Sequence, residues 1–345
     1  MQYAILGRTG VKVSRICLGT ATFGVAPTAQ DADQLVGAAI DLGINFVDTA
    51  DVYGNMPVFD RPGAPAAADR EPAEQILGRA LRGRRDQLVI ATKSNGIVGP
   101  DINDRGLSRR HIFRQVETSL RRLGTDYIDL YYAHDPDPDT PLEQTLAAYD
   151  DLVRQGKIRY FGLSNHPAWQ VTQALWIADD RRLQSPVAAQ VKYNLIDRAA
   201  ERELGPACDR FGLSIVPYAP LHGGLLADLA VLDREVSGDQ RFGAAGFSGS
   251  EVAVAREVDR LARVWGLAPY QVSLAWLLSR AAVASAIVGA ETPEELHANA
   301  TAADVELEPE QLATLTALAA ESAAFYHRAG DGPGQPAATS PDLAE

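Results

Sequence analysis

The sequence contains very little cysteine and no long apolar run. Only two cysteines, Cys17 and Cys208, occur among its 345 residues, and both fall in apolar segments. Two thiols cannot build a disulfide framework or a cysteine-rich metal site, so we expect both to be small core residues. No apolar stretch approaches the roughly 18 residues of a transmembrane helix. The N-terminus lacks the charged start and apolar stretch of a signal peptide, which predicts a cytoplasmic protein without a membrane partner.

Basic side chains are also in deficit. The chain has 32 Lys and Arg against 45 Asp and Glu, a net charge of −13. Because binding to phosphate backbones needs clusters of basic side chains, we expect no nucleic-acid partner and no adhesion to anionic membranes. Apolar residues make up 46% of the chain, enough for a large core. A length of 345 residues is ordinary for a single α/β barrel.

Short β-rich runs alternate with segments of helical periodicity along the chain. This alternation predicts parallel strands joined by crossover helices, and eight such units predict a (β/α)8 barrel. A doubly wound sheet is the alternative, but it usually has fewer strands and a glycine-rich turn after the first, and no Gly-x-Gly-x-x-Gly is present. The eight strand candidates are Ile16–Leu18, Asn45–Asp48, Leu88–Ala91, Ile128–Tyr132, Tyr160–Leu163, Val187–Val191, Ser214–Val216 and Ser285–Val288.

Capping signals support the helix assignments. Ser108 is expected to cap the third helix and Gly124 to end it. Thr140-Pro141-Leu142-Glu143 predicts an N-cap, a proline in the first turn and a capping-box glutamate, with Gly156 closing that helix. Thr292-Pro293-Glu294-Glu295 repeats the pattern after the eighth strand.

The barrel is expected to occupy residues 1–328 as one domain. Before the first barrel strand, Tyr3–Leu6 and Val11–Ser14 flank Gly-Arg-Thr-Gly, which predicts a β-hairpin that closes the bottom of the barrel. The connections at residues 54–71 and 220–249 are longer than packing needs, and loops of that length often act as lids or are disordered. Residues 329–345 lack apolar periodicity and are expected to form a mobile tail.

Polar side chains leave several strands at the end of the barrel where active sites lie. Asp48 ends the second strand candidate and Tyr53 follows it, Lys93 follows the third, and His134 follows the fourth. We hypothesise that Asp48 orients Lys93, whose charge lowers the pKa of Tyr53. Tyr53 then donates a proton to an oxygen that gains negative charge, with His134 as a second donor. That chemistry fits the reduction of a carbonyl by an external hydride, although each residue alone also has a purely structural interpretation.

The chain resembles the aldo-keto reductases from about residue 3 to about residue 320. Each matching motif is weak alone, but their order over the whole chain is specific. The motifs are Leu-Gly-Thr-Ala-Thr-Phe-Gly at 18–24, Asp-Thr-Ala-Asp-Val-Tyr-Gly at 48–54, Ala-Thr-Lys at 91–93, Leu-Arg-Arg-Leu-Gly-Thr-Asp-Tyr-Ile-Asp-Leu-Tyr at 120–131, Gly-Leu-Ser-Asn at 162–165, Gln190 with Tyr193-Asn194, Tyr-Ala-Pro-Leu at 218–221 and Ile-Val-Gly-Ala at 287–290.

The resemblance implies a (β/α)8 barrel that binds a nicotinamide dinucleotide, usually NADP(H), without a Rossmann fold. By position, Tyr53 corresponds to the general acid, and Asp48, Lys93 and His134 complete a catalytic tetrad. These four residues are called the tetrad below.

The resemblance also implies which residues bind the cofactor. Ser164, Asn165 and Gln190 are expected to hydrogen-bond the nicotinamide carboxamide, and Tyr218 is expected to stack on the ring. The loop after the seventh strand is expected to lie along the pyrophosphate, and residues 289–299 around the adenosine. The full set is Gly19, Thr20, Asp48, Ser164, Asn165, Gln190, Tyr218, Ala219, Pro220, Leu221, Gly223, Leu225, Gly289, Glu291, Glu295 and Asn299.

The adenosine end departs from the family pattern. Relatives that bind the 2′-phosphate of NADP commonly place Arg or Lys around positions 290–295, where this chain has Ala-Glu-Thr-Pro-Glu-Glu. Acidic side chains repel a phosphate, although Glu295 also has a structural role as the capping-box partner of Thr292. Because Glu291 has no such role, we hypothesise that the preference for NADP(H) is weakened toward NAD(H).

The substrate side is unusually polar. Asp135 follows the tetrad histidine, His166 follows the fifth strand, and His222 lies in the loop after the seventh. A mouth of this polarity suits a hydroxylated carbonyl compound or polyol, such as a sugar, unless these side chains face solvent at the rim. Phe23 and Phe59 are the aromatic candidates for the pocket, with a core role equally open for each. No metal site is expected, because no His-x-x-x-His or comparable spacing occurs.

Three functions fit these features. The first is a working reductase or dehydrogenase of an aldehyde, ketone or sugar alcohol. The second is a cofactor-binding, redox-sensing subunit of the same fold, as potassium-channel β subunits of this family are. The third is a barrel enzyme that uses Lys93 as a Schiff base, but such an enzyme has no need of the carboxamide-binding set at Ser164, Asn165 and Gln190. The sequence favours the first.

Overall fold

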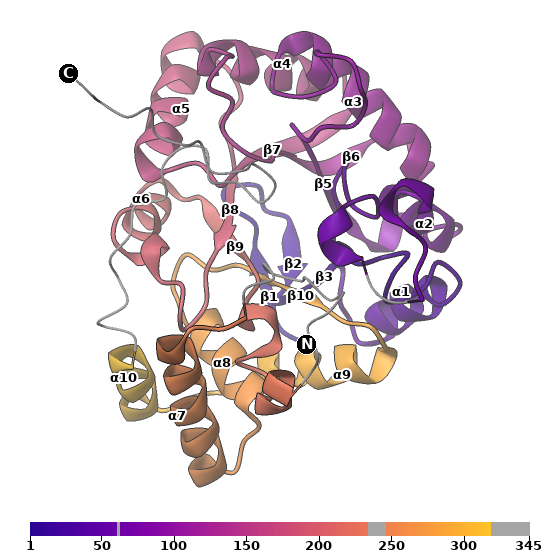
Figure 1. The fold of residues 1–345 in the computed structure, drawn as a ribbon. Coiled ribbons are helices and arrows are strands. Elements are labelled where there is room, and N and C mark those ends of the chain that lie inside the picture. The colour runs from indigo at the N-terminus through magenta and orange to yellow at the C-terminus, as the bar shows by residue number, and fades with distance from the viewer. Residues whose placement is uncertain (61–62, 234–245, 319–345) are drawn as a thin grey trace, which may run out of the picture.

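The computed structural model describes residues 1–60, 63–233 and 246–318 of the chain (Figure 1). Eight parallel strands form one sheet in the order β10-β3-β4-β5-β6-β7-β8-β9. Ile215 in β9 bridges Val283, which leads into β10, so the sheet curls into a nearly closed barrel and the predicted (β/α)8 fold is confirmed. The strands are β3 (Ile16–Gly19), β4 (Phe46–Asp48), β5 (Val89–Ser94), β6 (Ile128–Ala133), β7 (Ile158–Ser164), β8 (Ala188–Lys192), β9 (Ser214–Tyr218) and β10 (Ala286–Gly289).

All eight predicted strands are present, and several run further toward the mouth of the barrel than predicted. β5 continues through Thr92, Lys93 and Ser94, which pair with β6, and β9 continues to Tyr218. The apolar run ends earlier in each of these strands, but the pairing continues into the polar residues. Backbone hydrogen bonds therefore fix the positions from which those polar side chains project.

A ring of helices surrounds the barrel (Figure 1). Of the helices in the described part of the chain, none is both long and apolar enough to cross a bilayer. The α-helices are α1 (Ala32–Asp41), α2 (Ala73–Ala80), α3 (Arg109–Leu123), α4 (Leu142–Arg154), α5 (Ala168–Arg181), α6 (Leu204–Phe211), α7 (Gly249–Trp265), α8 (Pro269–Leu278), α9 (Pro293–Thr301) and α10 (Pro309–Ala317). Short 3-10 turns are η1 (Pro57–Phe59), η2 (Ala67–Asp69), η3 (Arg85–Gln87), η4 (Ala199–Glu201), η5 (His222–Gly224), η6 (Leu229–Asp233) and η7 (Ala302–Asp304).

The caps of α3 are confirmed, but the predicted N-cap of α4 is wrong. Ser108 accepts a hydrogen bond from the N–H of His111, and Gly124 ends α3 in the left-handed conformation. At α4 the N-cap is Pro141 rather than Thr140. The hydroxyl of Thr140 donates instead to Asp137 at 2.8 Å, so the turn before the helix uses the oxygen that was expected to cap it.

The core has two layers. One lies between the strands and the surrounding helices, and the other fills the inside of the barrel. The predicted hairpin, β1 (Tyr3–Ile5) with β2 (Lys12–Ser14), is present, and the buried Leu6 and Val13 belong to the inner layer. Cys17 lies in the inner layer and Cys208 in the outer one, both fully buried with free thiols, as expected of core residues.

The connection between β4 and α2 is built around Arg70. This arginine is 5% exposed and donates to the carbonyls of Pro65 and Gly54 at 2.9 and 3.2 Å. Asn55 donates to the carbonyls of Ala67 and Arg70 at 3.0 and 2.7 Å. Side-chain donors thus fold this long loop onto itself. Residues 61–62, the centre of the 220–249 connection and the predicted tail at 329–345 lie outside the described residues.

Candidate active site

The tetrad converges at the carboxyl ends of β4, β5 and β6. The ammonium of Lys93 donates to Asp48 Oδ1 at 2.5 Å, to the carbonyl of Thr49 at 2.7 Å and to the Tyr53 hydroxyl at 3.3 Å. These three contacts use all three ammonium donors, so they fix the position of the nitrogen against the phenol. The sequence pattern did not single out Thr49, because it contributes a backbone atom.

His134 completes the group from the end of β6. Its ring lies edge-on to the ring of Tyr53, with 5.9 Å between centroids and an interplanar angle of 77°. Its backbone N–H donates to the carbonyl of Ser94 at 2.9 Å, which ties the start of this loop to β5. Burial, followed by the charge of Lys93, lowers the pKa of His134 well below its ordinary value. The imidazole is therefore neutral at pH 7 and carries one N–H to donate.

The pKa of Tyr53 is shifted in the opposite direction to the one expected. Burial lowers the pKa of Lys93, but Asp48 and the phenol outweigh that effect, so its pKa lies above the ordinary value. Burial raises the pKa of Tyr53, Lys93 lowers it, Asp48 raises it, and the net direction is upward. The expected net lowering by Lys93 is thus wrong, because burial outweighs the ammonium, whose charge Asp48 also balances. Tyr53 stays protonated at neutral pH, as a proton donor must.

The residues implied in carboxamide binding lie beside the tetrad. Gln190 Nε2 donates to Asp48 Oδ2 at 2.8 Å. Asn165 donates to Asp135 Oδ1 at 2.9 Å and accepts from the Tyr218 hydroxyl at 3.1 Å. In contrast, the Ser164 hydroxyl is buried without a hydrogen-bond partner. A buried hydroxyl without a partner is costly, which makes it the member of the set most open to an incoming polar ligand.

The loop after β9 and the end of β10 shape the rest of the implied cofactor site. Ala219, His222 and Gly223 have positive φ values of 49°, 46° and 69°, so the backbone turns sharply through Pro220, Leu221 and η5 to the buried Leu225. Asn299 in α9 is 8% exposed. Around Gly289 no other atom lies within 4 Å of the position that a Cβ would occupy, which leaves open space at the end of β10.

Gly19 and Thr20 have structural roles at the end of β3. A Cβ on Gly19 would lie 2.8 Å from Ile287 Cγ2 and 3.3 Å from the carbonyl of Val288, so close packing against β10 requires glycine. Thr20 is fully buried, and its hydroxyl donates to the carbonyl of Asp48 at 3.0 Å. Both residues hold the strand end that carries Asp48.

These features fit a nicotinamide dinucleotide. The buried Ser164 hydroxyl lacks a partner, and Tyr218 and Gln190 lie at neighbouring strand ends beside it. The end of β10 at Gly289 is open to solvent. The chemistry of these groups thus suits a carboxamide and an aromatic ring, and the assignment of each residue to the cofactor stays a prediction.

At the start of α9, the N-cap is present but the predicted capping box is wrong. Thr292 Oγ1 accepts from the N–H of Glu295 at 3.2 Å, as expected of the cap. The carboxylate of Glu295 accepts from the N–H of Glu291 at 2.9 Å, one residue before the N–H that a capping box uses. A carboxylate therefore lies at the helix N-terminus, where a ligand phosphate otherwise binds well.

The candidate substrate residues do not form one pocket. Asp135 is half-buried against Asn165, and burial raises its pKa to about 6. His166 is 4% exposed, and its Nδ1 lies 2.7 Å from the carbonyl of Ser164, while burial lowers its pKa to about 4. Its ring lines a separate polar cavity of about 280 Å³. Asp135 therefore lies beside the tetrad, whereas the role of His166 at the substrate stays a prediction.

His222 lies in surroundings that were not expected, whereas Phe23 takes the core role that the sequence left open and the pocket role of Phe59 stays a prediction. His222 is 7% exposed and lies between two carboxylates, with Nδ1 2.8 Å from Asp197 Oδ2 and Nε2 3.0 Å from Glu251 Oε1. These acids come from distant segments and were not predicted. Phe23 is fully buried in the outer core layer, and Phe59 is half-buried in η1. Tertiary packing, which no local pattern reveals, decides these three positions.

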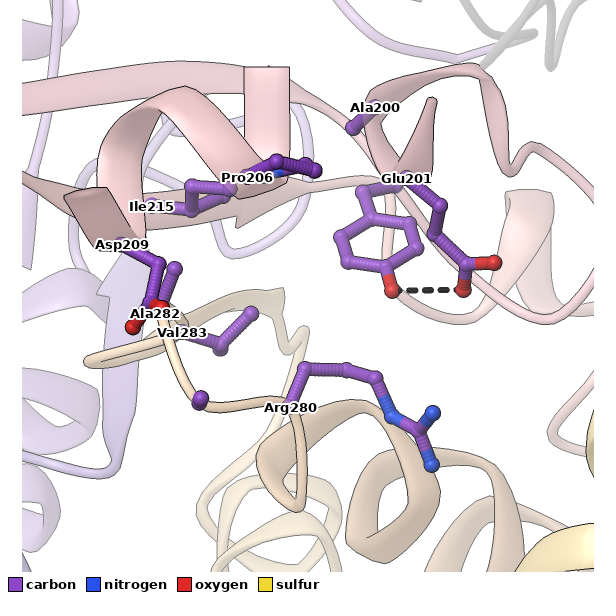
Figure 2. A pocket seen from close by; sticks show the side chains of 11 residues that line it. Ala200, Glu201, Pro206, Asp209, Ile215, Arg280, Ala282 and Val283 are labelled. Atoms are coloured by element: carbon purple, nitrogen blue, oxygen red, sulfur yellow. Dashed lines mark hydrogen bonds between the residues drawn. The ribbon is translucent and has the colours of Figure 1, made fainter. Parts of the chain in front are cut away.

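Cavity size does not identify the site. A groove of about 270 Å³ lies between α6 and the segment after α8 and contains no tetrad residue (Figure 2). There the Tyr193 hydroxyl donates to Glu201 at 2.7 Å, and Arg280 lies across the groove. Among the residues that the structure describes, no three His, Cys, Asp or Glu side chains gather as a metal site. The convergence of polar groups on Lys93 is thus what identifies the candidate site.

A buried carboxyl next to the site predicts a pH-dependent stability. Asp51 is 2% exposed, and no side chain hydrogen-bonds to either of its carboxylate oxygens. Arg122 binds the carboxylate of the buried Glu74 at 3.1 Å instead. Burial, then the charge of Glu74, raises the pKa of Asp51 to about 8. An aspartate in the unfolded chain has a pKa of about 3.9, so between these values the folded state holds one more proton than the unfolded state.

Titration of Asp51 should therefore lower the free energy of unfolding by about 1.4 kcal/mol per pH unit as the pH rises from about 5 to about 8. Replacing Asp51 with Asn should remove that slope. Urea unfolding of the wild type and of Asp51→Asn at several pH values measures it, with Asp41→Asn, an exposed acid, as the control. Stability curves that run parallel for the wild type and Asp51→Asn contradict the prediction.

Comparison with known proteins identifies the class. The sequence matches the Aldo/keto reductase family over residues 15–320. The chain belongs to this family of oxidoreductases.

Several relatives match nearly the whole chain. An uncharacterized oxidoreductase, YrpG, of Bacillus subtilis is 37% identical over 324 residues, covering 91% of this chain and 95% of its own. A probable voltage-gated potassium channel subunit beta of Oryza sativa is 35% identical over 321 residues, covering 88% and 92%. Versiconal hemiacetal acetate reductase of Aspergillus parasiticus is 32% identical over 343 residues, covering 90% and 95%.

Proposed function

We propose that this protein is an NAD(P)H-dependent oxidoreductase that interconverts a carbonyl compound and an alcohol, with Tyr53 as the general acid and base. The observation that carries the proposal is the placement of the Tyr53 hydroxyl 3.3 Å from Lys93, whose other two donors are held by Asp48 and Thr49. When bound, the reduced nicotinamide supplies a hydride to the carbonyl carbon.

Tyr53 donates its proton to the substrate oxygen as negative charge develops there. The Lys93 ammonium, 3.3 Å away, then stabilises the phenolate that remains. The neutral imidazole of His134 donates a second hydrogen bond to the same oxygen and orients the carbonyl. In the oxidative direction the phenolate accepts the proton of the alcohol.

The same contacts argue against Schiff-base chemistry at Lys93. A nucleophilic lysine must lose its proton, whereas Asp48 and Tyr53 together raise the pKa of this ammonium above its ordinary value despite burial. All three of its donors are also engaged. Lys93 therefore acts as a fixed positive charge.

A redox-sensing subunit is the second candidate. Relatives named as potassium channel β subunits, 31–35% identical to this chain, favour it. Turnover distinguishes the two: a subunit of this kind binds the cofactor tightly but oxidises it slowly with every carbonyl compound.

Two measurements test the proposal. Quenching of tryptophan fluorescence on titration with NADPH and with NADH reports cofactor binding without knowledge of the substrate. A panel of aldehydes, ketones and sugars, followed by the loss of reduced-nicotinamide absorbance, then reports turnover. Failure of both cofactors to bind overturns the redox function, and tight binding without turnover favours the second candidate.

The substrate that we propose is a hydroxylated carbonyl compound. Asp135 presents a carboxyl beside the tetrad, and the Lys192–Asp197 ion pair, 3.0 Å long, lies at the end of β8. Buried or half-buried polar groups of this kind discriminate against substrates that leave them without a hydrogen bond. We therefore expect higher kcat/KM for short hydroxyaldehydes than for unsubstituted aldehydes of equal length.

We also predict that NADPH is not strongly preferred over NADH. Glu295 and Glu291 place negative charge at the start of α9, close to the position implied for the 2′-phosphate. Dissociation constants for the two cofactors should differ by less than about 100-fold, and Glu291→Arg should strengthen NADPH binding by about tenfold with little change for NADH. Glu310→Arg, which makes the same charge change in α10, is the control. A preference for NADPH above 100-fold contradicts the prediction.

A further inference from the structure

Helix α5 exposes two tryptophans on one face. Trp169 is 61% exposed and Trp176 is 67% exposed, although the chain has only four tryptophans. A separation of seven residues places both side chains on the same side of the helix, about 10 Å apart along its axis. The opposite side, with Val171 and Ala174, is buried against the barrel. Large exposed apolar side chains that share one face are typical of an interaction surface.

We propose that this face of α5 binds a second copy of the same chain, with the two α5 helices antiparallel across a two-fold axis. The midpoint between Trp169 and Trp176 falls between Thr172 and Gln173. In an antiparallel pair, Trp169 of each copy therefore opposes Trp176 of the other. The exposed Thr172 and Gln173 meet at the axis and can hydrogen-bond across it. One surface thus complements itself, as a two-fold interface requires.

The charges on α5 favour the antiparallel direction. Asp180 lies eleven residues after Trp169, on the same face, and is exposed in the last turn. A carboxylate there interacts unfavourably with the C-terminal end of its own helix. At the other end, the N-cap is Pro167, no side chain caps the helix, and the first turn has no acidic residue. An antiparallel partner brings its Asp180 to this uncapped end, where the helix dipole and the first N–H groups attract an anion.

The size of the surface fits a modest dimer. Four tryptophans that bury on the order of 100 Å² each contribute roughly a third to a half of the about 1,000 Å² expected of a specific interface. We expect a dissociation constant in the micromolar range, because the interface is at the small end of stable ones.

Sedimentation velocity of the full chain from about 1 to 100 μM tests the proposal. The wild type should shift from monomer to dimer across this range, and Trp169→Ser/Trp176→Ser should remain monomeric. Val264→Ser, which removes an apolar residue on α7 that is 68% exposed, should dimerise like the wild type. A wild type that stays monomeric overturns the proposal. A double variant that dimerises normally overturns it as well, because the dimer then uses another face.

A cross-linking experiment tests the antiparallel register. The two native cysteines are fully buried, so a single new thiol reports its own neighbours. Gln173→Cys lies next to the axis and should form an intermolecular disulfide under mild oxidation, whereas Val264→Cys should not. Asp180→Lys should weaken the dimer about tenfold, because it reverses the charge at the partner's helix start. Absence of the disulfide at position 173, or an unchanged affinity of Asp180→Lys, contradicts this register.

Discussion

Replacing Tyr53 with phenylalanine is expected to lower turnover by about 100-fold or more while leaving cofactor affinity nearly unchanged. The substitution removes only the hydroxyl that lies 3.3 Å from Lys93, and the ring still packs edge-on against His134. Because the hydroxyl donates its proton only as charge develops on the substrate, its loss affects kcat and kcat/KM together. Steady-state kinetics with any carbonyl substrate found in the panel measures both constants.

Tyr3→Phe is the matched control for this substitution. Its hydroxyl donates to the carbonyl of Gly43 at 2.9 Å in the N-terminal hairpin, away from the tetrad, so kcat should not change. Fluorescence titration should give similar cofactor affinities for the wild type and both variants. Turnover of Tyr53→Phe within a few-fold of the wild type refutes the role of Tyr53. A strong loss of cofactor binding shows instead that the hydroxyl supports the cofactor site.

The fold could be predicted because parallel barrel strands are buried on both sides. Such strands are short apolar runs, and turn residues and capping signals separate them from helices. The polar residues at the end of each apolar run, such as Asp48 in β4 and Lys93 in β5, were therefore recognisable as side chains at the mouth. Barrel topology alone then brings them together, since the carboxyl ends of all eight strands meet at one end.

Features that depend on a distant partner, or on a choice between two nearby partners, could not be predicted. His222 is next to no acid in the sequence, yet its ring lies between Asp197 and Glu251. The sequence around Thr140 is typical of an N-cap, but the Thr140 hydroxyl donates a hydrogen bond to Asp137 instead. At His222 the tertiary structure supplies both partners, whereas at Thr140 a second local partner, Asp137, competes with the predicted capping contact.

The direction of the pKa shift at Tyr53 is a further example. A neighbouring lysine lowers the pKa of a phenol, and the sequence predicts that neighbour correctly. The sequence does not predict how deeply the phenol is buried or how fully Asp48 balances the ammonium. Burial, the larger effect, raises the pKa of Tyr53. Sequence motifs thus predict which groups lie together, and burial decides whether the pKa of such a group rises or falls.

The buried ion pair beneath Tyr53 predicts a second large effect. Replacing Lys93 with methionine leaves Asp48 buried and without its cation, and the loss of one member of a buried pair costs about 3–5 kcal/mol of stability. Lys93 is fully buried and Asp48 is 2% exposed, so water cannot replace the lost partner at low cost. Turnover should also fall strongly, because nothing then stabilises the Tyr53 phenolate. Urea unfolding measures the first effect and steady-state kinetics the second.

The double variant Asp48→Asn/Lys93→Met separates the two effects. Removing both charges should restore much of the lost stability, because no unpaired ion remains in the core, while turnover stays low. The stability deficit of Lys93→Met should also be largest near neutral pH and shrink as the pH falls below about 4. At such a pH the carboxyl becomes protonated in the unfolded state as well as in the folded state, so the cost of burying its charge disappears. A Lys93→Met variant as stable as the wild type, or a double variant no more stable than Lys93→Met, contradicts a paired buried charge at this site.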